Sequence, residues 1–136
     1  MSHDVHDQAR QRLSRLAADP AGEESPAGRL RRDAALVGRL LGAAGRDDAV
    51  AAVPDQGGAP VVTEADAADV GAGLSLLEEM RVALDQLEAQ VVMEARRRGL
   101  DWRQIARHRG LNSSQAASQR YQRLVTRLEE MRQGVR

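Results

Sequence analysis

The chain contains no cysteine, no phenylalanine and no lysine, and it has a single tryptophan and a single tyrosine among its 136 residues. Without cysteine there is no disulfide bond, no thiolate nucleophile and no zinc site built on thiolates. No apolar run approaches the roughly 20 residues that a membrane-spanning helix needs. The core must therefore be small and must be built mainly from alanine, leucine and valine.

Runs of β-branched residues long enough for a sheet are also missing, whereas alanine-rich segments with spaced leucines favour helix. We therefore expect an all-α protein, with a helical N-terminal arm ahead of a long helix and two short helices. The first ten residues are polar and include two aspartates, unlike a secretory signal. This composition favours a cytoplasmic protein without a membrane partner.

The N-terminal region, residues 1–60, is expected to be acidic and loosely helical. One short helix is predicted over residues 4–18, and Ser25 followed by Pro26 predicts the start of a second one. A linker rich in proline and glycine follows at 54–60. The remainder, from residue 61 onward, is predicted to form one helical domain, 61–136.

The formal net charge of zero hides a strong division along the chain. Residues 1–90 contain 9 arginines and 16 acidic residues, whereas residues 91–136 contain 11 arginines and 4 acidic residues. A basic segment of this kind indicates a polyanionic partner for the C-terminal part. The alternative is an ordinary helical surface whose charges are solvated.

A regular apolar pattern predicts a long helix from Leu74 to Arg98, with Gly99 at its end. Its apolar positions alternate spacings of three and four, at Leu77, Met80, Leu84, Leu87 and Val91. This seam from Leu77 to Val91 is expected to pack on its own chain. A homodimer contact through the same seam is the alternative.

Two short helices are predicted next, and together they suggest a helix-turn-helix at about 101–128. Asp101 with Gln104 predicts the capping of the first helix, and Asn112 with Gln115 that of the second. Gly110 between them suits a tight turn with positive φ. The side chains expected to face inward are Trp102, Ile105, Ala106, Leu111, Ala116, Ala117, Tyr121, Leu124 and Leu128.

The outer face of the second short helix carries groups that recognise DNA. Glutamine can bind adenine through both ends of its amide, and arginine can bind guanine in the same way. The candidates for base contacts are Gln115, Ser118, Gln119, Gln122 and Arg123. The candidates for phosphate contacts are Arg103, Arg107, Arg109, Ser113, Ser114 and Arg120. No acidic residue occurs from 102 to 128, which favours double-stranded DNA as the partner.

The run from Gly99 to Leu124 also resembles small actinobacterial helix-turn-helix proteins, some of which are described as heat-shock transcriptional regulators. The shared features are Gly-x-x-Trp-x-x-Ile-Ala, then Gly-Leu, then Gln-Ala-Ala-x-x-Arg-Tyr-x-Arg-Leu. The resemblance covers roughly residues 74–128 and implies a DNA-binding transcriptional regulator. Arg109 departs from it, because such proteins commonly place leucine before the turn glycine.

Two other interpretations remain open at this stage. The protein could be an interaction module, in which the helix pair is a scaffold and the acidic N-terminal region binds a protein partner. The acidic half could instead cover the basic half and weaken DNA binding. A metal site at His3 and His6 is not expected because a third ligand is missing. No cofactor is indicated, and no acid pair has a neighbouring nucleophile, so enzymatic activity is not expected.

Overall fold

The computed structural model describes residues 2–18, 22–50 and 65–134. These residues contain helices and no β-strand, which confirms the expected all-α class. The elements are α1 (Ser2–Ser14), the 3-10 helix η1 (Gly22–Glu24), α2 (Pro26–Val50), α3 (Ala67–Arg97), α4 (Trp102–Arg109) and α5 (Ser114–Arg132). None of these helices is long and apolar enough to cross a membrane. The linker predicted at 54–60 lies outside the described residues.

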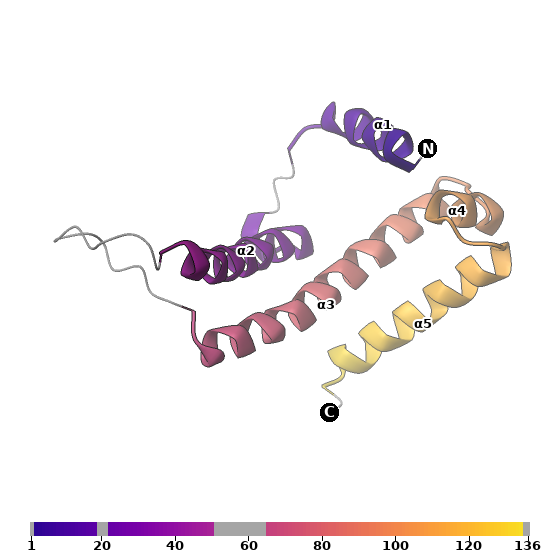
Figure 1. The fold of residues 1–136 in the computed structure, drawn as a ribbon. Helices are drawn as coiled ribbons and strands as arrows, with labels where there is room; N and C mark the ends of the chain where they lie inside the picture. The colour runs from indigo at the N-terminus through magenta and orange to yellow at the C-terminus, as the bar shows by residue number, and fades with distance from the viewer. Residues whose placement is uncertain (1, 19–21, 51–64, 135–136) are drawn as a thin grey trace.

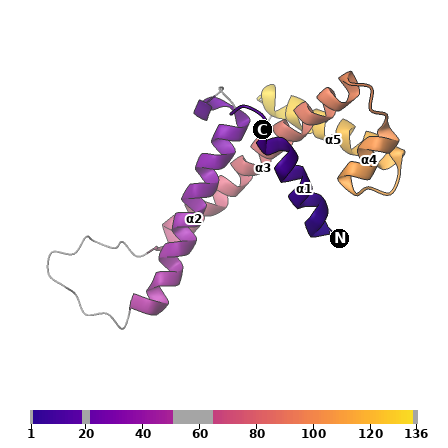
Figure 2. The same ribbon diagram turned by 90° about the horizontal axis from the view of Figure 1, so that it is seen from above.

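The longest helix, α3, is the spine on which the other elements pack (Figure 1). α2 lies against α3, from Gly73 to Gln86, and runs in the opposite direction, while α4 and α5 follow the C-terminal end of α3 (Figures 1 and 2). After α4 the chain reverses, and α5 returns alongside α3. α1 lies apart from this assembly; its apolar residues Val5 and Leu13 are exposed, as is Leu16 just after it.

α2 begins as the sequence predicts, at Ser25 and Pro26. The backbone N–H of Gly28 donates to Ser25 Oγ at 3.0 Å, so the serine caps the helix. Further along α2, Arg29 Nη2 donates to Gln86 Oε1 of α3 at 2.7 Å. Past its middle, α2 also lies close to α3, because Gly73 leaves room there for the side chain of Leu40.

α3 begins seven residues earlier than the predicted start at Leu74, which was wrong. Asp66 caps the helix by accepting from the N–H of Asp69 at 2.9 Å, and the Asp69 side chain accepts from the N–H of Asp66 at 3.1 Å. This reciprocal capping box satisfies two otherwise unpaired donors. The two glycines that follow are tolerated within α3, and Gly73 is buried against α2.

The predicted seam of α3 is buried only in part. Leu84 is 54% exposed and Val91 is 67% exposed, so packing of the whole seam on its own chain was wrong. The buried residues of α3 are instead Gly73, Ala83 and Val92. They differ from the seam because α2 packs on one part of α3 and the C-terminal helices pack on another. Burial therefore does not follow one continuous stripe.

The main core lies where the end of α3 meets α4 and α5. Its buried members are Val92, Ile105, Ala106 and Ala117. Partly buried side chains surround it, and they are Ala95, Leu100, Trp102, Leu111 and Tyr121. Small residues in this core, Ala106 and Ala117, let the helices approach closely.

Candidate nucleic-acid interface

The first short helix, α4, has the ends that the sequence predicts. Asp101 Oδ1 accepts from the N–H of Gln104 at 2.9 Å, and Gln104 Oε1 accepts from the N–H of Asp101 at 2.8 Å. Gly110 ends the helix with a φ of 71°, a left-handed conformation that glycine adopts without steric cost. The N–H of Leu111 then donates to the carbonyl of Ala106 at 2.8 Å, which closes the turn.

The second short helix, α5, is capped by a different residue from the one predicted. Ser113 Oγ accepts from the N–H of Ala116 at 3.1 Å, and the helix begins at Ser114. The prediction that Asn112 caps α5 with Gln115 was wrong. Both Asn112 and Ser113 have capping side chains, and the turn extends one residue further, so that the serine takes the capping position.

The base-contact candidates lie mostly on the exposed side of α5. Ala117 and Leu124 are 4% and 2% exposed and define the side that packs inward. At about 100° per residue, the opposite side carries Gln115, Gln119 and Gln122. Those three glutamines are exposed, as is Arg123, whereas Ser118 is half-buried at the edge of the packed side.

The phosphate-contact candidates fall into two groups. Arg103, Arg107 and Ser114 are exposed, and the two arginines form no ion pair within residues 2–18, 22–50 and 65–134. The remaining arginines in this set, Arg109 and Arg120, are engaged by a carboxylate of α3. Ser113 is also engaged, because its hydroxyl caps α5.

That carboxylate belongs to Glu88, a residue that the sequence reasoning did not single out. Arg120 donates to it twice, from Nε to Oε2 at 2.7 Å and from Nη2 to Oε1 at 3.1 Å. Arg109 Nη2 lies 3.3 Å from the same Oε2. The hydrogen bond from Arg120 lowers the pKa of Glu88, and the nearby charge of Arg109 adds to this effect against the opposing effect of burial. Glu88 is therefore ionised and links α3 to both α4 and α5.

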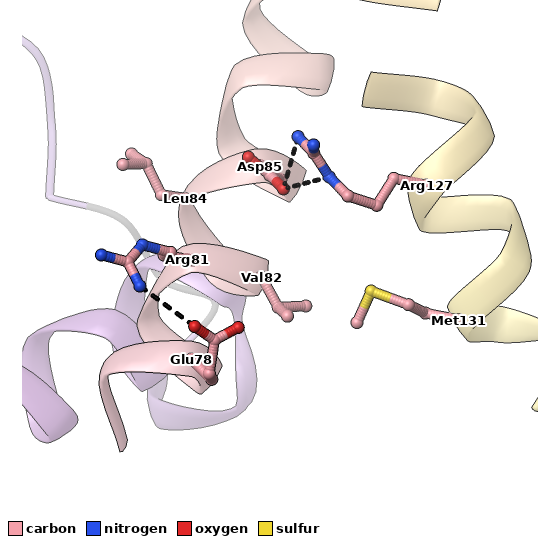
Figure 3. Close-up of a pocket in the computed structure, with 7 residues that line it drawn as sticks. All are labelled: Glu78, Arg81, Val82, Leu84, Asp85, Arg127 and Met131. Carbon is pink, nitrogen blue, oxygen red and sulfur yellow. Dashed lines mark hydrogen bonds and ion pairs between the residues drawn. The ribbon is translucent and has the colours of Figure 1, made fainter. Parts of the chain in front are cut away.

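A second ion pair joins the same helices further along. Arg127 of α5 donates from Nε to Asp85 Oδ2 of α3 at 3.2 Å, and its Nη2 lies 3.1 Å from that oxygen. Beyond this pair, α3 and α5 enclose a groove of about 440 Å³, across which Val82 faces Met131 (Figure 3). On the α3 side of the groove, Arg81 pairs with Glu78 at 3.0 Å. The groove's carboxylates thus already have arginine partners.

The three arginines that end α3 are likewise engaged. Arg96 lies over the indole of Trp102, with its guanidinium carbon 5.0 Å from the ring centre. Arg97 and Arg98 both bind Glu94, and these hydrogen bonds, with that from Arg97 contributing most, lower the pKa of Glu94 to about 2. These contacts stabilise the last turn of α3 where the helix dipole favours positive charge.

Nothing in the sequence pattern pointed to Glu88 or Asp85 as partners of the C-terminal arginines. Among the described residues, no three histidine, aspartate or glutamate side chains come together as metal ligands would. Comparisons of the chain with protein-family models, with curated proteins and with solved structures found no match. Function is therefore inferred from this chain's own residues.

Proposed function

We propose that α4 and α5 act as a helix-turn-helix that binds double-stranded DNA sequence-specifically, and that the protein is a transcriptional regulator. The exposed side of α5 carries the proposal. It presents Gln115, Gln119, Gln122 and Arg123 to solvent, and no acidic residue occurs anywhere from 102 to 128. A merely solvated helix pair usually mixes charges of both signs.

The chemistry of this face suits a major groove. The groove of B-DNA is about 12 Å wide and admits one α-helix. Glutamine and arginine side chains on such a helix can form paired hydrogen bonds with adenine and guanine edges. Arg103 and Arg107 on α4 are available for the phosphates that flank the groove. The backbone N–H groups at the first turn of α5, which a neutral serine caps, suit phosphate oxygens as well.

Binding to a mixed-sequence 30-base-pair duplex, followed by fluorescence anisotropy at increasing salt, tests DNA binding directly. We expect the affinity to fall with salt, and the Arg107→Gln variant to bind more weakly with a shallower salt dependence. Arg31→Gln is the matched control, because Arg31 is an exposed arginine of α2 without an ion pair in the described residues. Equal losses from the two variants, or no binding at low salt, would contradict the proposal.

The exposed side of α3 favours an additional role in association. Leu84 and Val91 are seven residues apart, lie on the same side of the helix, and are 54% and 67% exposed. A second copy seated on this side would form a homodimer, whose two α5 helices could meet successive major grooves about 34 Å apart. A different protein could use the same surface. Sedimentation equilibrium of the wild type and of a Leu84→Ser/Val91→Ser variant distinguishes these outcomes.

A further inference from the structure

The basic segment is partly neutralised from within the molecule. Of the six arginines from 102 to 128, three bind carboxylates of α3. Glu88 engages Arg109 and Arg120, and Asp85 engages Arg127. The acidic N-terminal part of the chain therefore contacts the basic C-terminal part, and α3 supplies the carboxylates that make these contacts. α2, in contrast, contacts α3 between Gly73 and Gln86.

The geometry at Glu88 differs from that of an ordinary surface ion pair. Its side chain is only 10% exposed, whereas those of Arg109 and Arg120 are 44% and 48% exposed. The Glu88 side chain is nearly covered, whereas almost half of each arginine side chain stays exposed. The paired hydrogen bonds from Arg120 have the planar arrangement that arginine also uses with phosphate.

The two arginines also lie next to the proposed DNA-binding face. Arg109 is the last residue of α4, directly before the turn at Gly110. Arg120 follows Gln119 on α5, at the flank between the exposed side and the side that packs on α3. Both side chains are therefore placed where a DNA backbone passing along α5 would come within their reach.

We propose that Glu88 is a specificity-determining positioning residue, which occupies the place of a DNA phosphate at Arg109 and Arg120 and so limits sequence-independent binding. This inference rests on the proposed function. Phosphate contacts add affinity for every sequence but carry no sequence information. Holding two arginines on α3 thus lowers binding to unrelated DNA, while Gln119 and its neighbours keep their access to the bases.

The central test replaces the carboxylate by its uncharged isostere. The dissociation constant for an unrelated 30-base-pair duplex is measured against salt for the wild type, for Glu88→Gln and for Glu79→Gln. Glu79 is an exposed acid of α3 without an ion pair in the described part of the chain, so its variant makes the same change in net charge. Circular dichroism establishes that each variant is folded.

We expect Glu88→Gln to bind the unrelated duplex more tightly and to make the slope of log K against log salt steeper by about 1–2, as one or two added phosphate contacts require. Glu79→Gln should keep the wild-type slope. A purely structural role for Glu88 would not steepen the slope. A slope equal to that of the wild type, or shallower, would overturn the inference while leaving DNA binding itself intact.

Arginine variants keep the inference testable if Glu88→Gln fails to fold. In the otherwise wild-type protein, Arg120→Gln should weaken DNA binding much less than Arg107→Gln does, because Arg120 is already engaged. Equal losses from these two variants would overturn the inference. If neither the wild type nor Glu88→Gln binds duplex DNA at low salt, the proposed function and the inference both fail.

Discussion

Trp102 and Tyr121 lie with their ring centres 5.8 Å apart and their planes tilted by 43°. They are the only two aromatic side chains of the chain, and they join the start of α4 to the middle of α5. Arg96 of α3 also lies over the indole of Trp102. α3, α4 and α5 therefore meet at one tryptophan.

Trp102→Ala should destabilise this part of the molecule strongly. The ring is half-buried and contacts both Tyr121 and Arg96, so the loss is expected at about 3 kcal/mol, toward the low end for truncation of a large aromatic side chain. Urea denaturation followed by circular dichroism measures it. Trp102→Phe is the control and should lose much less, since it keeps an aromatic ring against Tyr121. Equal stability of the alanine variant and the wild type would contradict this account of the core.

Gln119→Ala should relax base preference at one position of the target site. The exposed amide can bind adenine through two hydrogen bonds, and losing such a pair costs about 1–3 kcal/mol of discrimination. Competition binding between the preferred duplex and single-base variants measures this effect. Arg107→Ala is the comparison, and it should weaken binding to all of the duplexes alike. The same loss of base preference in both variants would contradict the division between base and phosphate contacts.

Two glycine substitutions should change stability in opposite directions. A Cβ at Gly28 would overlap the carbonyl oxygen of Gly22 and lie 2.7 Å from the Cα of Glu23, so Gly28→Ala should destabilise the packing of η1 on α2. A Cβ at Gly71 would meet no atom within 4 Å. Gly71→Ala should therefore stabilise α3 by about 0.5–1 kcal/mol through helix propensity. Thermal denaturation of both variants measures whether each substitution raises or lowers the stability. A gain in stability from Gly28→Ala would show that η1 does not pack on α2 as described.

The pH dependence of stability should report on Glu88. Because its pKa in the folded protein is lowered from the ordinary value of 4.5, its ion pairs contribute fully above that value. The contribution is lost as the pH falls from 4.5 through the lowered pKa of the folded state. Glu88→Gln should therefore flatten the acid limb of the stability profile, measured by urea denaturation from neutral to acidic pH. Glu79→Gln provides the control, and an unchanged limb in Glu88→Gln would contradict the assignment.

The local features of α4 and its turn could be predicted from the sequence because their partners are only three or four residues away. Asp101, Gln104 and Gly110 each fulfil the predicted role through such contacts. The start of α5 was harder to predict, because Asn112 and Ser113 are adjacent and both suit a helix cap. The length of the turn decides which of the two residues caps α5, and the residue spacing in the sequence does not give that length.

The contacts of α3 depend on tertiary packing, so the periodicity of its apolar residues could not predict them. The regular leucine spacing predicted one seam, yet Leu84 and Val91 face solvent because the neighbouring helices pack on other sides of α3. The pairing of Arg120 with Glu88 spans 32 residues of sequence. The two side chains can pair only because α5 returns alongside α3. The charge pattern of the basic C-terminal segment, taken alone, therefore overstates the number of arginines without an ion-pair partner.

Selection of binding sites from a randomised duplex library by the full-length protein at physiological salt tests DNA recognition most directly. The proposal predicts that sequences sharing a defined motif are enriched, and an inverted repeat of that motif would show that the protein binds as a dimer. The Gln119→Ala variant, selected in parallel, should lose preference at one position of the same motif. Failure of the wild type to enrich any sequence would contradict sequence-specific DNA recognition.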